Sequence, residues 1–128
     1  MDSSVFYFEQ GIPGFEHLHQ FAFADLEVSP PMKLMQSVED MEISLIVVSP
    51  FFIYPEYEWI LSEAAKEELQ IQSEQEVEIW TVLTVPVDPA AATINLMAPI
   101  VLNANKKTGK QVILHDSTYS SKSPINRI

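Results

Sequence analysis

The sequence predicts an all-β domain, a small antiparallel barrel-like or sandwich fold with one short helix. Three observations lead to this prediction. Apolar residues alternate with other residues in several short runs, which is the period of a strand. Proline and other turn-forming residues separate these runs, and only one segment has helical spacing. With 128 residues, 47% of them hydrophobic, residues 1–128 are expected to form a single domain with its own core.

The first two expected strands, residues 5–9 and 17–24, lie on either side of a turn. Residues 5–9 read VFYFE, and their apolar side chains on both faces are typical of a strand buried on both sides. The turn is expected at Pro13 and Gly14, because proline supplies the fixed φ and glycine the positive φ of a type II turn. The second strand alternates again and continues to Ala24.

The middle of the sequence predicts a hairpin, a helix and a long strand. We expect strands at residues 33–38 and 43–49 around a turn at residues 39–41, a helix at residues 62–70, and a strand at residues 76–85. Pro50 ends the second hairpin strand, because proline lacks the N–H that a sheet requires. Ser62 can cap the helix, whose Ala65 and Leu69 share one face. Both faces of the long strand carry apolar side chains, so its outer face must be partly covered.

Two more runs with strand character, residues 93–103 and 111–116, flank a loop at residues 104–110. The loop contains residues that favour hairpin turns, namely Asn105, Thr108 and Gly109. Pro99 lies inside the first run, and a central strand accepts proline only at an edge or a bulge. The tail from about residue 117 to residue 128 is expected to be flexible.

Charge is distributed unevenly along a chain whose net charge is −11. Residues 1–88 carry −15 and residues 89–128 carry +4, with Lys106, Lys107 and Lys110 in the loop at 104–110. Such an acidic surface repels nucleic acid and attracts basic proteins. There is no cysteine, no secretory signal and no apolar run of the roughly 20 residues that cross a bilayer. We therefore expect a cytoplasmic protein with a basic protein partner and without direct binding to nucleic acid or membrane.

The best candidates for catalysis are His17 and His19. Strand residues two apart point the same way, so two imidazoles could share a metal ion. A cupin-like metal-binding enzyme is therefore the alternative function, and a purely structural interaction module is a third. The cupin motif also needs a glutamate four or five positions after the second histidine, where this sequence has Phe23 and Ala24. Because a metal site needs about three protein ligands, we expect no metal and no other cofactor.

Aromatic residues are concentrated in the segment SPFFIYPEYEW at residues 49–59. Most of them are expected to fill the core, but Pro55 and the glutamates keep part of the segment at the surface. Exposed aromatics with an acidic rim suit a protein interface. The residues expected to contact a partner are Phe51, Phe52, Tyr54, Glu56, Tyr57, Glu58, Glu63, Glu67, Glu68, Glu74, Glu76 and Glu78.

Six segments occur in an order that resembles one protein family. They are GIPGFE at 11–16, SPF at 49–51, YPEYE at 54–58, LTV at 83–85, NLMAPIVLN at 95–103 and KQVIL at 110–114. Together they resemble the FliW family of flagellar assembly factors, over roughly Phe8 to Tyr119. One departure is that only Met1 to Gln10 precede the GIPGFE turn, so the chain starts late or its first strand is short. The matching positions expected to be structural are Gly11, Pro13, Gly14, Phe15, Pro50, Asn95, Pro99 and Asn103.

The resemblance implies a cytoplasmic bacterial protein that folds as a β barrel, catalyses no reaction and binds newly made flagellin. It also implies a second partner, the carbon storage regulator CsrA, a basic dimer that represses flagellin translation by covering its messenger RNA. In this family picture free FliW removes the repression, whereas flagellin-bound FliW does not. The resemblance therefore predicts that flagellin synthesis is coupled to flagellum assembly by partner switching.

Overall fold

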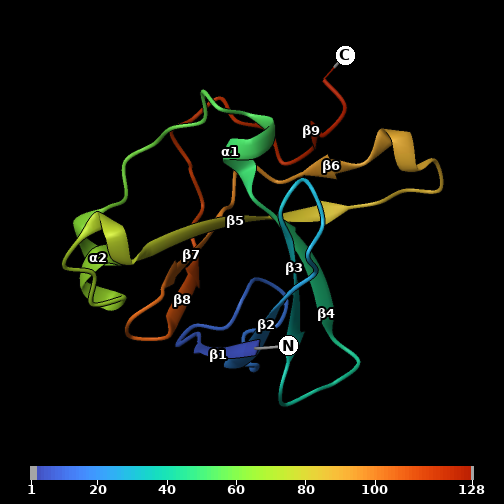
Figure 1. The fold of residues 1–128 in the computed structure, drawn as a ribbon. Coiled ribbons are helices and arrows are strands. Elements are labelled where there is room, and N and C mark those ends of the chain that lie inside the picture. Colours follow the sequence, from blue (N-terminus) through green and yellow to red (C-terminus); the bar gives the residue numbers. More distant parts are fainter. Residues whose placement is uncertain (1–2, 128) are drawn as a thin grey trace.

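A closed barrel of seven strands forms the body of the computed structural model, which describes residues 3–127 (Figure 1). The strands are β1 (Ser3–Tyr7), β2 (Gln20–Asp25), β3 (Met32–Ser37), β4 (Ser44–Val48), β5 (Val77–Thr84), β7 (Ile100–Asn103) and β8 (Thr108–Gln111). They are paired in the order β4-β3-β2-β1-β8-β7-β5, and pairing of β5 with β4 closes the barrel. The predicted all-β class is confirmed, but the barrel is mixed rather than wholly antiparallel, because β1 and β8 run parallel.

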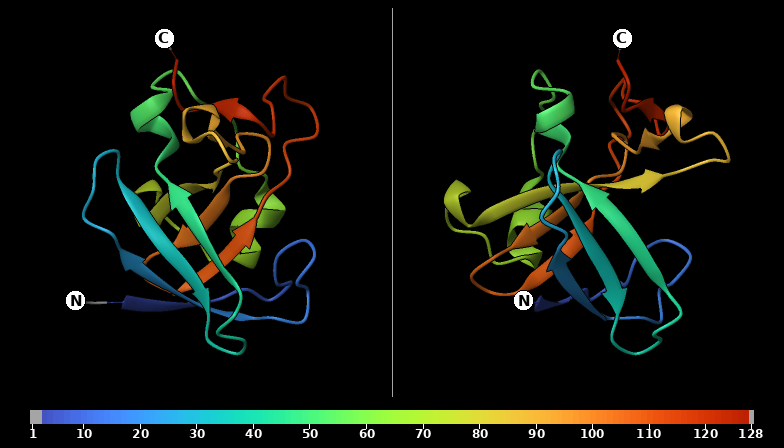
Figure 2. Two further views of the ribbon diagram at one scale, coloured as in Figure 1. Left: turned by 90° about the vertical axis from the view of Figure 1, so that its right-hand side faces the viewer. Right: turned by 45° about the vertical axis from the view of Figure 1, so that its right-hand side comes forward.

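Smaller elements lie around the barrel. They are α1 (Pro50–Ile53), α2 (Glu63–Glu68), the 3₁₀ turns η1 (Glu74–Glu76) and η2 (Pro89–Ala91), and the short strands β6 (Thr93–Ile94) and β9 (Ser123–Pro124). Figure 2 places α1, β6 and β9 at one end of the barrel. The prediction of one helix was thus too low, since Pro50 not only ends β4 but also begins α1. No helix within residues 3–127 is long and apolar enough to span a bilayer.

The first strand is buried on one face only, so the expected burial of both faces was wrong. Phe6 and Phe8 point into the barrel and are at most 4% exposed, whereas Val5 and Tyr7 are each 47% exposed. In the turn that follows, the Phe15 N–H donates to the Ile12 carbonyl at 2.8 Å. Gly14 has φ +90°, as expected there.

Two hydrophobic clusters lie on opposite sides of β5. The side chains of Trp80 and Val82 belong to the cluster inside the barrel. Those of Ile79 and Leu83 belong to an outer cluster, together with residues of α1, of the segment after it and of the C-terminal part of the chain. The outer face of this strand is therefore covered, as its apolar pattern predicted.

The C-terminal third departs from the predicted strand pattern. Pro99 lies between β6 and β7, where its carbonyl accepts a hydrogen bond from the Val112 N–H at 2.9 Å, so it interrupts no strand. The turn of the β7–β8 hairpin ends at Lys107, which has φ +59°. Gly109 was expected in this loop but is buried within β8. Only glycine fits at this position, because a Cβ on Gly109 would lie 2.5 Å from the Phe8 ring.

The carboxamide of Asn103 joins the β7–β8 hairpin to α2. Asn103 is fully buried, and its Nδ2 donates to the carbonyls of Leu69 at 2.8 Å and Gln70 at 3.2 Å. Its Oδ1 accepts from the backbone N–H groups of Asn105 and Lys106. One side chain thus satisfies the carbonyls at the end of α2 and the donors of the hairpin turn. At the other end of α2 the predicted cap is confirmed, because Ser62 accepts from the Ala65 N–H.

The close contact at Gly109 makes a testable prediction. Replacing Gly109 with alanine forces the Phe8 ring to move and should lower the free energy of unfolding by about 1–3 kcal/mol, measured by urea denaturation. In a Phe8→Leu background the loss should shrink by about 0.5 kcal/mol or more, because neighbouring substitutions are not additive. Phe6→Leu, which truncates another barrel phenylalanine, is the matched control and should give no such relief. Equal losses in all three backgrounds would contradict the steric explanation.

Candidate protein-binding surface

The aromatic segment forms an exposed ledge, defined as residues 51–60, over the outer cluster. Phe51 and Phe52 on α1 are 44% and 59% exposed, and Ile60 at the far end is 91% exposed. Tyr54 and Trp59 are half-buried. Exposed apolar side chains gathered on one ordered segment are typical of a surface that binds another protein.

Tyr57 lies beneath the ledge and not on its surface. It is 2% exposed, and its hydroxyl donates to the Leu96 carbonyl at 2.7 Å. Its ring packs edge-on against the ring of Tyr119 at a centroid distance of 4.7 Å. Burial, and then the neighbouring Tyr119, raises the pKa of the Tyr57 phenol well above its usual value. The residue expected to contact a partner is therefore an anchor that holds the ledge in place.

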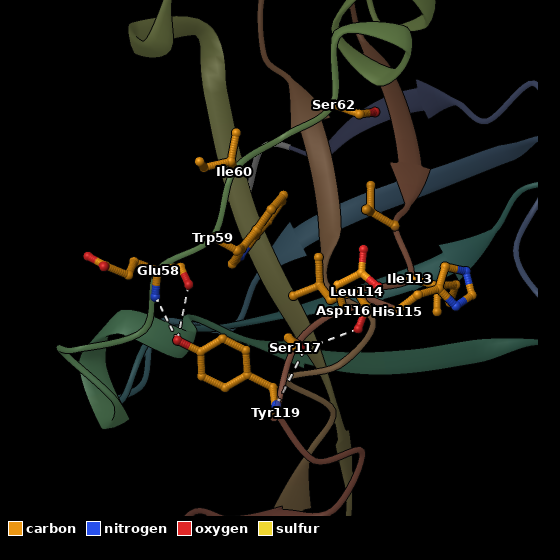
Figure 3. Close-up of a pocket in the computed structure, with 11 residues that line it drawn as sticks. Glu58, Trp59, Ile60, Ser62, Ile113, Leu114, His115, Asp116, Ser117 and Tyr119 are labelled. Atoms are coloured by element: carbon orange, nitrogen blue, oxygen red, sulfur yellow. Dashed lines mark hydrogen bonds between the residues drawn. The ribbon is translucent and has the colours of Figure 1, made fainter.

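Tyr119 clamps the middle of the ledge to the C-terminal part of the chain (Figure 3). Its hydroxyl accepts from the Glu58 N–H and donates to the Glu58 carbonyl, both at 3.0 Å. The tail that we expected to be flexible packs here as well. Its strand β9 pairs with β6, and Ser123 is buried. The ledge thus rests on a segment some sixty residues away in the sequence, as the separation of 61 between Glu58 and Tyr119 shows.

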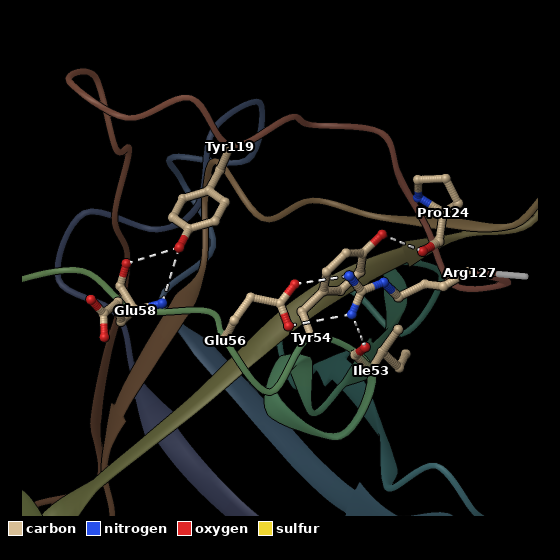
Figure 4. A network of polar contacts seen from close by, with 7 residues as sticks. All are labelled: Ile53, Tyr54, Glu56, Glu58, Tyr119, Pro124 and Arg127. Carbon is tan, nitrogen blue, oxygen red and sulfur yellow. Dashed lines mark hydrogen bonds and ion pairs between the residues drawn. The ribbon is translucent and has the colours of Figure 1, made fainter.

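Arg127 contacts the first part of the ledge (Figure 4). Its guanidinium forms an ion pair with Glu56 at 2.9 Å and lies over the ring of Tyr54. The pKa of the Glu56 carboxyl lies below its usual value, because its own backbone N–H and then Arg127 donate to it. Both predicted contact residues, Tyr54 and Glu56, are therefore in contact with a residue that the sequence analysis did not select.

Two open grooves flank the part of the ledge around Trp59. One, with a volume of about 820 Å³, lies between this segment and residues 112–119 (Figure 3). The other, of about 540 Å³, lies between the ledge and the start of β5. Its apolar lining comprises Phe51, Tyr57, Trp59, Ile60, Leu61, Ile71, Val77 and Ile79. The second groove has the apolar lining that suits the apolar face of a helix.

Several of the predicted acidic contact residues hold parts of the fold together. Glu76 accepts from the Gln72 N–H at 2.9 Å and from the Asn105 side chain at 3.3 Å, and the Gln72 contact is the main reason that its pKa is lowered. Glu78 accepts from the indole N–H of Trp80 at 3.0 Å. Within residues 3–127, the glutamates of the predicted set whose carboxylates have no ion-pair or hydrogen-bond partner are Glu58, Glu67 and Glu74.

The basic hairpin lies against the acidic helix α2. Lys110 forms an ion pair with Glu68 at 3.2 Å, although the two residues come from oppositely charged parts of the sequence. Glu63 is also paired, with Lys66 at 3.1 Å. Lys107 lies over the Phe6 ring instead, 5.2 Å from its centroid. The basic tip is thus partly neutralised within the molecule.

The remaining positions of the resemblance have backbone roles in the structure. A Cβ on Gly11 would lie 2.6 Å from the carbonyl oxygen of Phe15, and its φ of +64° also favours glycine. Asn95 accepts from the N–H groups of Met97 and Ala98 and shapes the turn before β7. Pro50 is buried at the start of α1.

The two histidines do not share a strand face, so that premise of the enzyme alternative was wrong. Strand β2 begins at Gln20, and His17 lies exposed in the preceding turn. His19 Nδ1 is 3.0 Å from the Phe8 carbonyl, and its ring stacks on Tyr7. Across residues 3–127, no group of three or more histidine, cysteine, aspartate or glutamate side chains is arranged to hold a metal ion.

The sequence analysis assigned no contact to three residues on which the ledge depends, namely Leu96, Tyr119 and Arg127, although Leu96 and Tyr119 lie within the stretch that resembles the family. Their contacts are 39, 61 and 71 residues away along the chain, and no periodic pattern encodes such distances. The one available signal was compositional: Arg127 is the sole arginine of the sequence. Arginine is the residue best suited to bidentate pairing with carboxylates.

Comparison with known proteins gives a consistent result. A sequence model described as FliW protein matches residues 1–125. The flagellar assembly factor FliW of Bacillus subtilis (strain 168) is 41% identical over 124 residues, which is 97% of this chain and 87% of that protein. The protein of that name from Thermosipho africanus (strain TCF52B) is 37% identical over 126 residues, covering 98% and 87%.

A solved structure is similar as well. It is described as the crystal structure of the flagellar assembly factor FliW and matches with a TM-score of 0.89 at 40% sequence identity. The match covers 94% of this chain and 84% of that chain. Similarity in sequence and in fold thus extends over nearly the whole chain.

The hydrogen bonds between Tyr119 and Glu58 can be tested by removing the Tyr119 hydroxyl. Tyr119→Phe removes both hydrogen bonds to Glu58 and should cost about 1 kcal/mol of stability. Hydrogen exchange at the Glu58 amide should accelerate, while exchange in the barrel strands stays unchanged. Tyr7→Phe is the matched control, because the Tyr7 hydroxyl has no hydrogen-bond partner within residues 3–127. Unchanged protection at Glu58 would show that the clamp does not order the ledge.

Proposed function

The chain belongs to the FliW family of flagellar assembly factors, and we propose that it works by binding two proteins in turn, flagellin and the translational repressor CsrA. Bound to CsrA, it prevents repression of flagellin synthesis. Bound to flagellin, it leaves CsrA free to repress. The protein acts in the cytoplasm, uses no cofactor and catalyses no reaction.

The observation that carries the proposal is the ledge, an exposed apolar surface on an ordered base with acidic residues beside it. Phe51 and Phe52 are exposed, yet the segment beneath them is tied down through Tyr57 and Tyr119. A rigid apolar surface binds with a smaller entropic cost than a mobile one. Flagellin has amphipathic terminal helices in the family picture, and the apolar groove between the ledge and β5 is our preferred site for one of them.

The charge of the molecule supports a basic second partner. The carboxylates of Glu58, Glu67 and Glu74 remain unpaired within the described residues, and the net charge is −11. A protein that binds messenger RNA must be electropositive. An acidic surface therefore speeds its encounter with the regulator and weakens RNA binding by placing negative potential near the RNA surface.

The cupin-like enzyme receives no support from the arrangement of His17 and His19 described above. The relatives are named as assembly factors, which also favours a binding protein. A purely structural module would bind one partner permanently, whereas the proposed switch requires two complexes that exclude each other. Binding measurements with both partners therefore separate these two possibilities.

The experiment that tests the proposal mixes the purified protein with flagellin and CsrA and resolves the complexes by size-exclusion chromatography with light scattering. Each partner should bind alone, and flagellin should release CsrA without forming a ternary complex.

The association rate with CsrA should fall as salt is raised from low to physiological levels, because salt screens long-range attraction. A stable ternary complex would contradict the switch, and a salt-independent rate would contradict electrostatic steering.

The role of the ledge in flagellin binding is tested by Phe52→Glu. Because Phe52 is 59% exposed, the substitution should leave the melting temperature nearly unchanged but weaken flagellin binding at least about tenfold, as for a central apolar interface residue. Met41→Glu is the matched control, since Met41 is 66% exposed in the β3–β4 turn and outside the ledge. Isothermal titration calorimetry measures both variants. If the two variants bind flagellin with equal affinity, the ledge is not part of the flagellin site.

A further inference from the structure

The guanidinium group of Arg127 is bound from three sides by the ledge (Figure 4). The ring of Tyr54 lies 4.2 Å below it. The Glu56 carboxylate accepts from Nη1 at 3.3 Å and from Nη2 at 2.9 Å. The carbonyl of Ile53 accepts a further bond from Nη1 at 2.9 Å. We call these three groups the cradle.

The cradle has the chemistry that distinguishes arginine from lysine. A guanidinium is planar, so it stacks on an aromatic ring and at the same time bonds both oxygens of a carboxylate. An ammonium group can also lie over a ring, but it has no flat face to stack and no fork of donors to bond both carboxylate oxygens. The cradle is therefore selective for the side-chain type that now occupies it.

Two groups of the cradle, the Tyr54 ring and the Ile53 carbonyl, are held by contacts that do not involve the Arg127 side chain. The Tyr54 hydroxyl donates to the Pro124 carbonyl, and the Tyr54 N–H donates to the Pro50 carbonyl at 2.8 Å. Ile53 is the last residue of α1 and packs with Tyr54 in the outer cluster. Ring and carbonyl would thus stay in position if the arginine left.

Arg127 is partly open to solvent and therefore replaceable. Its side chain is 44% exposed and that of Glu56 is 59% exposed. Water screens the charges of an exposed ion pair, so an arginine from another protein can compete for the same contacts. The cradle also adjoins a small hollow of about 270 Å³ that includes Phe52, one of the exposed ledge residues. An arriving protein could therefore contact Phe52 and place its own arginine in the cradle.

We propose that Ile53, Tyr54 and Glu56 form an arginine-binding site for a basic protein partner, and that Arg127 is an internal occupant that competes with it. The charge of −15 on residues 1–88 favours a basic partner for this site. The identity of that partner as CsrA rests on the proposed function, whereas the arginine site rests on the contacts of the cradle alone. With this competition, the partner's apparent affinity equals its intrinsic affinity multiplied by the fraction of time that the cradle is free.

The first test uses small probes on the full chain. Arg127→Gln empties the cradle, and N-acetyl-arginine amide is then titrated against it at millimolar concentrations. The NMR signals of Tyr54 and Glu56 should shift at least about three times more than in the unsubstituted protein, since the competitor is gone. N-acetyl-lysine amide should cause much smaller shifts. Adding Glu56→Gln should abolish the arginine response, whereas adding Glu42→Gln, an exposed carboxylate in the β3–β4 turn, should not.

The second test measures CsrA binding to Arg127→Lys, which keeps the net charge but cannot stack and bond bidentately. Affinity should rise about twofold to fivefold, as expected when a solvent-exposed competitor is weakened. Arg127→Gln should raise affinity at least as much, provided that its melting temperature is unchanged. Because this variant also removes a positive charge, its matched control is Lys122→Gln, which removes one from the same segment and should not reproduce the gain.

The outcomes separate the two proposals. Equal responses to the arginine and lysine amides would overturn the arginine site, whatever CsrA does. A loss of CsrA affinity in Arg127→Lys would show that Arg127 supports the ledge and would overturn the competition. If CsrA does not bind the unsubstituted protein at all, the proposed function fails, and the amide titration still decides whether the cradle is an arginine site.

Discussion

The burial of both faces of β5 is the constraint on which the rest of the molecule depends. Its inward side chains fill the barrel, and its outward ones support the cluster beneath the ledge. The same strand closes the barrel, because it pairs with β7 at its start and with β4 at its middle. Thr81 reinforces that closure by donating its hydroxyl hydrogen to the Val48 carbonyl at 2.9 Å. The proposed partner-binding surface lies over this strand and therefore has a rigid base.

The fold recombines charges that the sequence keeps apart. The basic residues of the last forty positions return to the acidic part of the molecule, where Lys110 meets Glu68 and Arg127 meets Glu56. The Arg127–Glu56 pair is exposed and the Lys110–Glu68 pair is largely buried. Each pair neutralises only one carboxylate, so the strong negative field stays largely intact. The pairs do change which carboxylates are available, and this distinguishes glutamates that shape the surface from those that face solvent.

The C-terminal part of the chain is a structural component of the surface. Tyr119 holds the backbone of the ledge, Pro124 accepts from Tyr54, and Arg127 occupies the cradle. A surface that is assembled from two distant segments can respond to events in either of them. The proposed competition by Arg127 is one such response, because it acts on the ledge without altering the barrel.

The sequence by itself determined the local elements. Alternation placed most strands within a few residues, Ser62 capped the helix as expected, and Pro13 with Gly14 formed their turn. These features depend on neighbours along the chain, whose spacing can be read directly. It also determined that β5 must be covered on both sides.

Only the tertiary structure decided the parallel pairing of β1 with β8, the burial of Gly109 against Phe8 and the inward position of Tyr57. It also removed His17 and His19 from a common face and brought Arg127 to Glu56. Apart from the position of the two histidines, each of these facts is a contact between residues far apart in the chain. Alternation states which side of a strand is apolar, but the partner that covers that side is chosen by the packing of the whole domain.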